Sequence, residues 1–299
     1  MRRAVRGVLM AAFAAVSLGW MASALFTQEP EAEPARVVIA IGSAGDDVVN
    51  RLGLPVRRSQ TVDALLYDAG PESLGRPVLP VIEHAGRRTV LPEADSLLFY
   101  DGLAGYEGIQ EINIRFALPP RPVGPQASRE HDDAVRQAVG RVLNALGEQG
   151  WQRYIPLSSP RVAGRHSYDL PGSWWQGEVE ASDPGYLPSL EEWQRLNHTP
   201  TWLWFDTGVF VQLSYYRGDA SLGQPGGLRA SVRTERLALR SYTAPALDDW
   251  AAVREGYALA IPGLLAQRRA AETRARASRV GILDDWRDPA VAGVTVPPT

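Results

Sequence analysis

The chain has 299 residues, of which 45% are hydrophobic and nine are Trp, a composition that fits a folded globular protein. All 31 basic residues are Arg, and they face 34 Asp and Glu residues, for a net charge of −3. Three of the arginines lie at the extreme N-terminus, which leaves 28 Arg against 34 acids and a charge near −6 for the remainder. This acidic balance argues against a nucleic-acid partner. The absence of Cys excludes a disulfide framework, a thiol nucleophile and a lipid-modified cysteine.

The N-terminal segment has the features of an export signal. Arg2, Arg3 and Arg6 precede an uncharged run over residues 7–27, which contains the A-x-A-like sequence Ala22-Ser23-Ala24. We interpret residues 1–24 as a signal peptide or a membrane anchor, because the run is just long enough to span a bilayer. The A-x-A sequence favours cleavage. The body is therefore expected in the periplasm, either free or anchored to the inner membrane by residues 7–26, after a polar linker over residues 25–35.

A glycine-containing stretch, VVIAIGSAGDDVVNRLGLP at residues 37–55, raises the question of a phosphate-binding loop. The β-branched residues predict a strand, and Ser43 with Asp46 predicts the N-cap of a helix that ends at Gly53. A dinucleotide loop needs a third glycine and a P-loop needs a Lys, and both are missing. Asp46 and Asp47 would also repel a phosphate at the helix N-terminus. We therefore interpret this stretch as structural.

The rest of the first half predicts mainly strands. The apolar runs and alternations are at 60–67, 78–83, 87–91, 96–100 and 112–118. In the last of them, INIRFAL, every second side chain is apolar. The sequence PPRPVGPQAS at residues 119–128 then carries four prolines and predicts a linker between an N-terminal domain, 36–118, and a C-terminal domain, 129–299.

The second half predicts helices around a hairpin. An amphipathic helix is expected over residues 129–148, a strand over 151–157, and a short helix capped by Ser189 and Glu192 that ends near Leu196. Residues 201–217 predict a hairpin around Asp206-Thr207-Gly208, followed by a strand over 228–242. A long helix is expected from about Leu247 to Arg279, with a kink at Pro262. The fold class predicted is α+β: two halves, each a helix packed on an antiparallel sheet, with a long C-terminal helix.

Signals for catalysis are missing from the sequence. His84, His131, His166 and His198 show no metal-ligand spacing, and neither H-E-x-x-H nor G-x-S-x-G occurs. We therefore predict no catalytic residues, no metal and no cofactor.

The charged clusters have a structural interpretation. The pairs Asp46-Asp47, Asp132-Asp133 and Asp248-Asp249 are each expected in the first turn of a helix, where they complement the helix dipole. The arginine-rich stretch at 268–279 is expected to be the solvated end of the last helix. The alternative for this stretch is contact with anionic lipid or an acidic partner.

The segment SWWQGEVEASDPGYLPSLEEW, residues 173–193, is the candidate binding site. It interleaves aromatic rings with carboxylates in a region of little periodicity, where binding residues concentrate. The alternative is that some of these rings pin the segment to the core. The predicted binding residues are Trp174, Trp175, Glu178, Glu180, Asp183 and Tyr186.

Three phrases in the second half carry a resemblance: GWQRYIPLSSPRV (150–162), YLPSLEEW (186–193) and TWLWFDTG (201–208). Together with the leader, they resemble envelope-side, periplasmic immunity proteins that accompany type VI secretion effectors. The resemblance implies a non-catalytic protein that binds and neutralises a toxic effector enzyme in the periplasm. It carries over no site motif. The alternatives are an envelope hydrolase with a dispersed Ser, His and carboxylate site, and a structural envelope protein.

Overall fold

The structure is a computed structural model that describes residues 32–61, 64–120, 127–168, 181–196, 199–218, 226–240 and 249–296, with side chains of the first helix of the second half described from residue 129. Residues 34–299 form one compact unit. The strands are β1 (Ala35–Ala40), β2 (Arg57–Gln60), β3 (Leu65–Asp68), β4 (Val78–His84), β5 (Arg87–Val90), β6 (Ala94–Asp101), β7 (Ile109–Phe116), β8 (Gln152–Arg153), β9 (Thr201–Asp206), β10 (Val209–Tyr216) and β11 (Gly227–Thr234). The helices are α2 (Gly45–Leu52), α3 (Pro71–Leu74), α4 (Ala127–Glu148), α5 (Leu190–Arg195), α6 (Glu235–Leu239) and α7 (Trp250–Ala277), with short 3-10 turns η1 (Leu103–Gly105) and η2 (Gly164–Tyr168).

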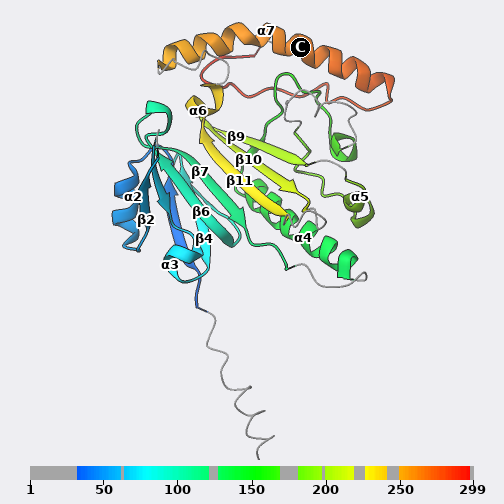
Figure 1. The fold of residues 1–299 in the computed structure, drawn as a ribbon. Helices are drawn as coiled ribbons and strands as arrows, with labels where there is room; N and C mark the ends of the chain where they lie inside the picture. Colours follow the sequence, from blue (N-terminus) through cyan, green and yellow to red (C-terminus); the bar gives the residue numbers. More distant parts are fainter. Residues whose placement is uncertain are drawn as a thin grey trace, which may run out of the picture. The chain divides into compact units, whose positions relative to one another are not determined.

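The strands form one sheet in the order β1-β4-β6-β7-β11-β10-β9-β8, with β5 beside β4 and the β2–β3 hairpin beside β6 (Figure 1). β7 pairs with β11, so strands from both sides of the predicted linker at 119–128 share this sheet. The predicted α+β class and the long C-terminal helix are confirmed. One pairing differs from the expected antiparallel arrangement, because β1 runs parallel to β4. The chain between them passes through α2, β2, β3 and α3, which is long enough for a parallel crossover.

The sheet curls, so that strands far apart in its order meet. The imidazole of His84, at the end of β4, donates to the backbone oxygen of Asp206 at 3.0 Å, and Arg87 pairs with the carboxylate of Asp206. Trp151 also donates from its indole nitrogen to the hydroxyl of Thr89 at 2.8 Å. The β4–β5 hairpin is thereby fixed against the β9–β10 turn.

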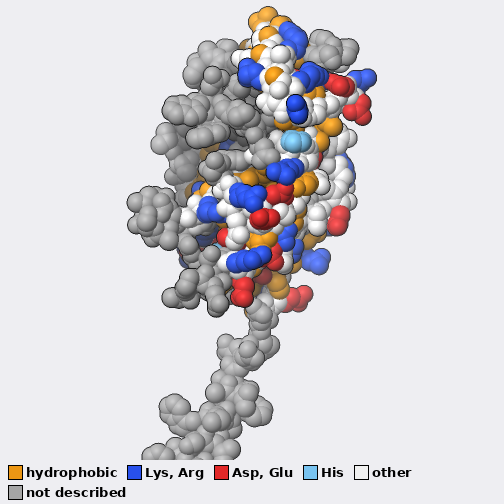
Figure 2. Space-filling model, turned by 90° about the vertical axis from the view of Figure 1, so that its right-hand side faces the viewer, with side chains coloured by type: hydrophobic (Ala, Val, Ile, Leu, Met, Phe, Trp, Pro, Cys, Tyr) orange, Lys and Arg blue, Asp and Glu red, His pale blue; other side chains and the backbone are white. Residues whose placement is uncertain are grey.

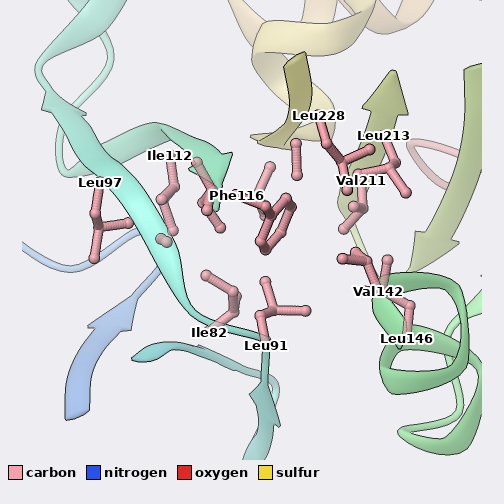
Figure 3. Packing of buried hydrophobic residues seen from close by; sticks show 14 of the residues in the cluster. Ile82, Leu91, Leu97, Ile112, Phe116, Val142, Leu146, Val211, Leu213 and Leu228 are labelled. Carbon is pink, nitrogen blue, oxygen red and sulfur yellow. The ribbon is translucent and has the colours of Figure 1, made fainter. Parts of the chain in front are cut away.

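Helix α4 fills the inside of this curl. Its apolar stripe, predicted from the sequence, is buried. Figure 3 shows Val142 and Leu146 of α4 in one layer with Phe116 of β7 and with Val211 and Leu213 of β10. The inner face of the sheet and one face of α4 therefore make the main core, and the alternate side chains of the same strands point outward.

Helix α7 covers a second, smaller cluster. Its residues Val253, Tyr257, Ile261 and Leu265 recur every four positions and are buried against Phe205 and its neighbours on β9. In Figure 1 this helix crosses above β9, β10 and β11. α7 continues through Pro262 as one helix. In the described part of the chain, no helix is both long enough and apolar enough to cross a membrane.

Several strand predictions were wrong in extent. Residues 60–67 do not form one strand but parts of the β2–β3 hairpin, whose turn is closed by the bond from the Thr61 N–H to the Ala64 oxygen. Of the predicted strand at 151–157, only β8 pairs with a neighbour. The predicted strand at 228–242 ends at Thr234, whose hydroxyl caps α6 by accepting from Leu237 N.

The capping predictions had mixed outcomes. The Ser189–Glu192 capping box of α5 is confirmed, with both of its reciprocal bonds present. The prediction for Ser43 was wrong, because the N-cap of α2 is Ala44 and no side chain of the cap residue bonds there. Asp132-Asp133 was wrongly placed in a first turn, since α4 begins at Ala127. Asp249 does cap α7 by accepting from Ala251 N, and Asp248 lies outside the described residues.

The interpretation of residues 268–279 as a solvated helix end was wrong at two positions. Arg268 and Glu272 are fully or almost fully buried. Arg268 forms a two-pronged pair with Asp288 at 2.6 and 2.9 Å and donates to backbone oxygens of residues 155, 156 and 159. Glu272 accepts from the guanidinium of Arg161 at 2.6 and 2.9 Å. These buried pairs join α7 to the segment after β8.

Candidate partner-binding surfaces

The predicted binding segment is only partly described. Trp174, Trp175, Glu178 and Glu180 lie outside the described residues, so their prediction is untested. Asp183 and Tyr186 are described, and both bond to residues 164–168, a group of bonded residues that we call the base of the segment. Trp193, at the segment's end, is a core residue: it is fully buried and its ring lies 4.8 Å from that of Tyr215.

Asp183 joins the chain before residue 169 to the chain after residue 180. Its carboxylate accepts from Gly164 N at 2.7 Å and from Gly185 N at 2.9 Å, and its own N–H donates to Ser167 Oγ at 2.8 Å. The Arg153 guanidinium lies 3.5 Å from the same carboxylate, and only 11% of the Arg153 side chain is exposed. Burial lowers the pKa of Arg153, and the Asp183 charge opposes this shift. Asp183 is therefore a structural anchor of the segment.

Tyr186 belongs to the same base. Its hydroxyl donates to Glu192 Oε2 at 2.7 Å, and its backbone oxygen accepts from the Tyr168 hydroxyl at 3.0 Å. Tyr168 in turn accepts from the Trp202 indole nitrogen of β9 at 2.8 Å. The hydrogen bonds from Tyr186 and from the Ser189 backbone lower the pKa of Glu192, which keeps this carboxylate ionised. Tyr168 therefore links Tyr186 to β9 of the sheet.

The glycine stretch after β1 is closed by the protein itself. The N–H of Gly45 donates to Asp101 Oδ2 at 2.6 Å. A side chain on Gly45 would meet the Tyr67 ring at 2.4 Å, and the backbone of Gly108 packs tightly on the oxygen of Gly42. Burial and the hydrogen bond to Asp46 raise the pKa of Tyr67 to about 12. The helix N-terminus that could receive a phosphate is therefore occupied by a carboxylate, which agrees with the structural interpretation.

The described histidines occupy different places. His84 bonds to a backbone oxygen, and His166 is exposed beside Arg165 in η2. His131 is on α4, with no bonded partner at its buried Nδ1 within the described chain, and His198 lies outside that part. Among the described ranges, no group of three or more His, Asp and Glu side chains could hold a metal ion. Within the described ranges, no histidine is hydrogen-bonded to a Ser or a carboxylate, the arrangement that the hydrolase alternative requires.

The outward face of β7 and β11 carries charged residues that the sequence reasoning missed. Arg229 of β11 lies directly opposite Arg115 of β7, and Arg233 lies opposite Glu111. The alternation in INIRFAL placed Arg115 on the outward face, but its partner strand lies more than a hundred residues away along the chain. Figure 2 shows another side of the molecule, on which arginine and acidic side chains are interspersed and hydrophobic side chains are scattered between them.

Comparisons of the chain with protein-family models, with curated proteins and with solved structures each find no match.

Proposed function

We propose that this protein is exported to the periplasm and acts there as a non-catalytic binding protein, of the kind that neutralises a toxic secreted effector enzyme. The leader and the resemblance of the second half to immunity proteins motivate the class of protein. The partner is a protein, and contact with the inner membrane is made only if the leader is retained.

One observation about the described residues supports a binding role for the segment around Trp174. The bond from Asp183 N to Ser167 Oγ and the bond from Gly164 N to the Asp183 carboxylate join the chain before residue 169 to the chain after residue 180. The buried Trp202–Tyr168–Tyr186 chain of hydrogen bonds fixes this junction to the sheet. A binding element held on a rigid base loses less conformational entropy on association than an unanchored one.

The predicted contacts have distinct roles. Trp174 and Trp175 would be anchor residues, because a few buried aromatics usually contribute most of the energy of an interface. Glu178 and Glu180 would speed encounter with a basic surface of the partner, an effect that falls with salt. The expected target is therefore an enzyme with a basic patch.

The test uses the product of the neighbouring gene, which the proposal expects to encode a toxic enzyme, directed to the periplasm. Co-production of the two proteins in the periplasm should protect cells, and calorimetry should show a stoichiometric complex. Trp174→Ala and Trp175→Ala should weaken the complex without lowering the melting temperature. Leu259→Ala is the matched control, because Leu259 is 75% exposed on α7, outside this segment. The proposal fails if the neighbouring product is neither bound nor neutralised. Tryptophan variants that lose binding only in proportion to lost stability would place the interface elsewhere.

A further inference from the structure

The outward face of β7 and β11 holds two arginines in direct register. Arg115 and Arg229 are Cα partners in the antiparallel pair, so their side chains project from the same face. Like charges placed directly opposite each other destabilise a sheet. The next outward pair, Ser231 and Asn113, is uncharged. The pair after it, Arg233 and Glu111, has opposite charges, and Arg233 Nε donates to Glu111 Oε1 at 2.8 Å. The two strands therefore contain one matched and one mismatched pair.

The described protein does not neutralise the mismatched pair with a close carboxylate. Arg115 Nε lies 3.8 Å from Asp95 Oδ2, and both side chains are about half exposed, at 49% and 47%, so water screens this contact. Arg229 makes no ion pair within the described ranges; its guanidinium lies over the Tyr216 ring, 5.1 Å from the ring centre. Stacking of this kind holds a guanidinium in place while its N–H groups stay open to another acceptor.

The surroundings of the two arginines favour hydrogen bonding. Ser96 and Ser214 flank them in the same row across the sheet, and Asn113, Ser231 and Gln212 form the next row. These side chains are only partly buried. On β9 the outward side chains Leu203 and Phe205 belong instead to the cluster under α7. The polar outward face of β7 and β11 therefore gives way, toward β9, to the apolar part of the sheet that α7 covers.

We propose that an acidic segment of the partner protein docks across β7 and β11, with its carboxylates accepting hydrogen bonds from Arg115 and Arg229. Guanidinium groups match carboxylates in geometry and charge, so the mismatch would be relieved on binding. The partner's side chains would also bond to Ser96 and Asn113, because Ser231, Ser214 and Gln212 already hydrogen-bond to other side chains of the protein. A short acidic protein segment fits better than nucleic acid or an anionic membrane, because the chain has a net charge of −3 and repels a highly charged partner more strongly than a short segment. This inference rests on the proposed function, since it gives the partner a second, acidic contact.

The test measures binding of a labelled synthetic peptide of alternating Glu and Ser to the full chain by fluorescence anisotropy. Affinity should be measurable at low salt and should fall as salt rises. Arg115→Gln with Arg229→Gln should weaken it by at least about tenfold, the loss expected when charge-assisted hydrogen bonds are removed. The control is Arg36→Gln with Arg57→Gln, which removes the same charge from exposed positions on β1 and β2. It should change the affinity by less than about twofold. Melting temperature should not fall in the first double variant, because a repulsive pair is removed.

Three outcomes overturn the inference: undiminished binding by the Arg115/Arg229 variant, equal binding of a matched Gln and Ser peptide, or inorganic phosphate competing as strongly as the peptide. The last would indicate a small-anion site. Failure here is distinguishable from failure of the proposed function, because the peptide has no need of Trp174 and Trp175. If the peptide does not bind but the partner protein is captured, only the proposed contact with Arg115 and Arg229 is refuted. If the peptide binds but the partner protein is not captured, only the proposed function is refuted.

Discussion

The carboxylate of Asp101, at the end of β6, accepts a hydrogen bond of 2.6 Å from the backbone N–H of Gly45, at the start of α2. A residue far away in the sequence thereby caps the helix, where the cap residue itself, Ala44, has no side-chain acceptor. The same carboxylate adds negative charge at the positive end of the helix dipole. The bond from Gly45 to Asp101 therefore gives the glycine stretch a structural role, which is to connect α2 to β6.

Asp101→Ala should lower the free energy of unfolding by about 0.5–2 kcal/mol, the usual effect of losing a helix cap. Asp101→Asn should have a smaller effect, because its amide oxygen can still accept. Ser43→Ala should change stability little, since the Ser43 side chain makes no cap bond. Urea unfolding of the three variants checks this, and a larger loss in Ser43→Ala than in Asp101→Ala would contradict it.

Gly108→Ala should be strongly destabilising. Gly108 has φ +77°, and a side chain there would lie 2.3 Å from the Gly42 oxygen, a rigid backbone atom. Positive φ alone disfavours Ala by about 1–2 kcal/mol, and the clash adds to this. Gly147→Ala is the control, because its side chain would meet open space on α4, and it should raise stability by up to about 1 kcal/mol. Thermal unfolding that gave the two variants the same melting temperature would disprove the close approach.

The Arg161–Glu272 pair should make stability depend on acid pH. Burial acts to raise the pKa of Glu272, but the hydrogen bonds and charge of Arg161, with the charge of Arg268, lower it below the ordinary value. Because the folded-state pKa is depressed, this stabilisation is fully present above the unfolded pKa of about 4.3 and is lost as pH falls through the folded value. Glu272→Gln should cost about 3–5 kcal/mol near neutral pH, since Arg161 stays buried without its counter-charge.

Urea unfolding of wild type and Glu272→Gln over a pH series tests that prediction. The difference between them should shrink toward acid pH. Glu255→Gln is the control, because Glu255 is exposed on the same helix. A difference between Glu272→Gln and wild type that does not change with pH would show that Glu272 stabilises through packing alone.

Trp193→Ala should lower stability by about 3–5 kcal/mol, because Trp193 is fully buried against Tyr215. Trp174→Ala and Trp175→Ala should leave it nearly unchanged if these residues serve the interface. Guanidinium unfolding of the three single variants separates core from surface tryptophans within the predicted binding segment. Equal losses in all three would indicate that every one of these rings belongs to the core.

Export is tested with a fusion of residues 1–40 to alkaline phosphatase, which folds to an active enzyme only in the periplasm. The fusion should be active, and replacing Arg2, Arg3 and Arg6 by Glu should reduce its export. Mass spectrometry of the mature N-terminus distinguishes cleavage after Ala24 from retention as an anchor. An inactive fusion, with the whole protein recovered from the cytoplasm, would refute the periplasmic location.

The sequence by itself determined the elements whose signals are local. The alternation in β7, the apolar stripe of α4 and the capping box at Ser189 each depend on residues a few positions apart, and each appears as predicted. The sequence also identified the stretch around Trp174 as unusual, and it gave Asp183 and Tyr186 as members of that region. It did not indicate that both residues form the base of the segment, because their partners Ser167, Arg153 and Tyr168 are joined to them only by folding.

Only the tertiary structure decided which distant residues meet. The parallel β1–β4 pair, the Asp101–Gly45 cap and the Arg115–Arg229 register each join residues at least about forty positions apart. Arg268 and Glu272 lie in a charged stretch that is typical of a solvated helix end. They are nevertheless buried, because Asp288 neutralises the charge of Arg268 and Arg161 neutralises that of Glu272. Local patterns specify secondary structure, since backbone hydrogen bonds and side-chain periodicity act over short range. Burial and charge pairing depend on partners from other elements, so they are fixed only when the sheet closes around α4 and α7 packs on its outward face.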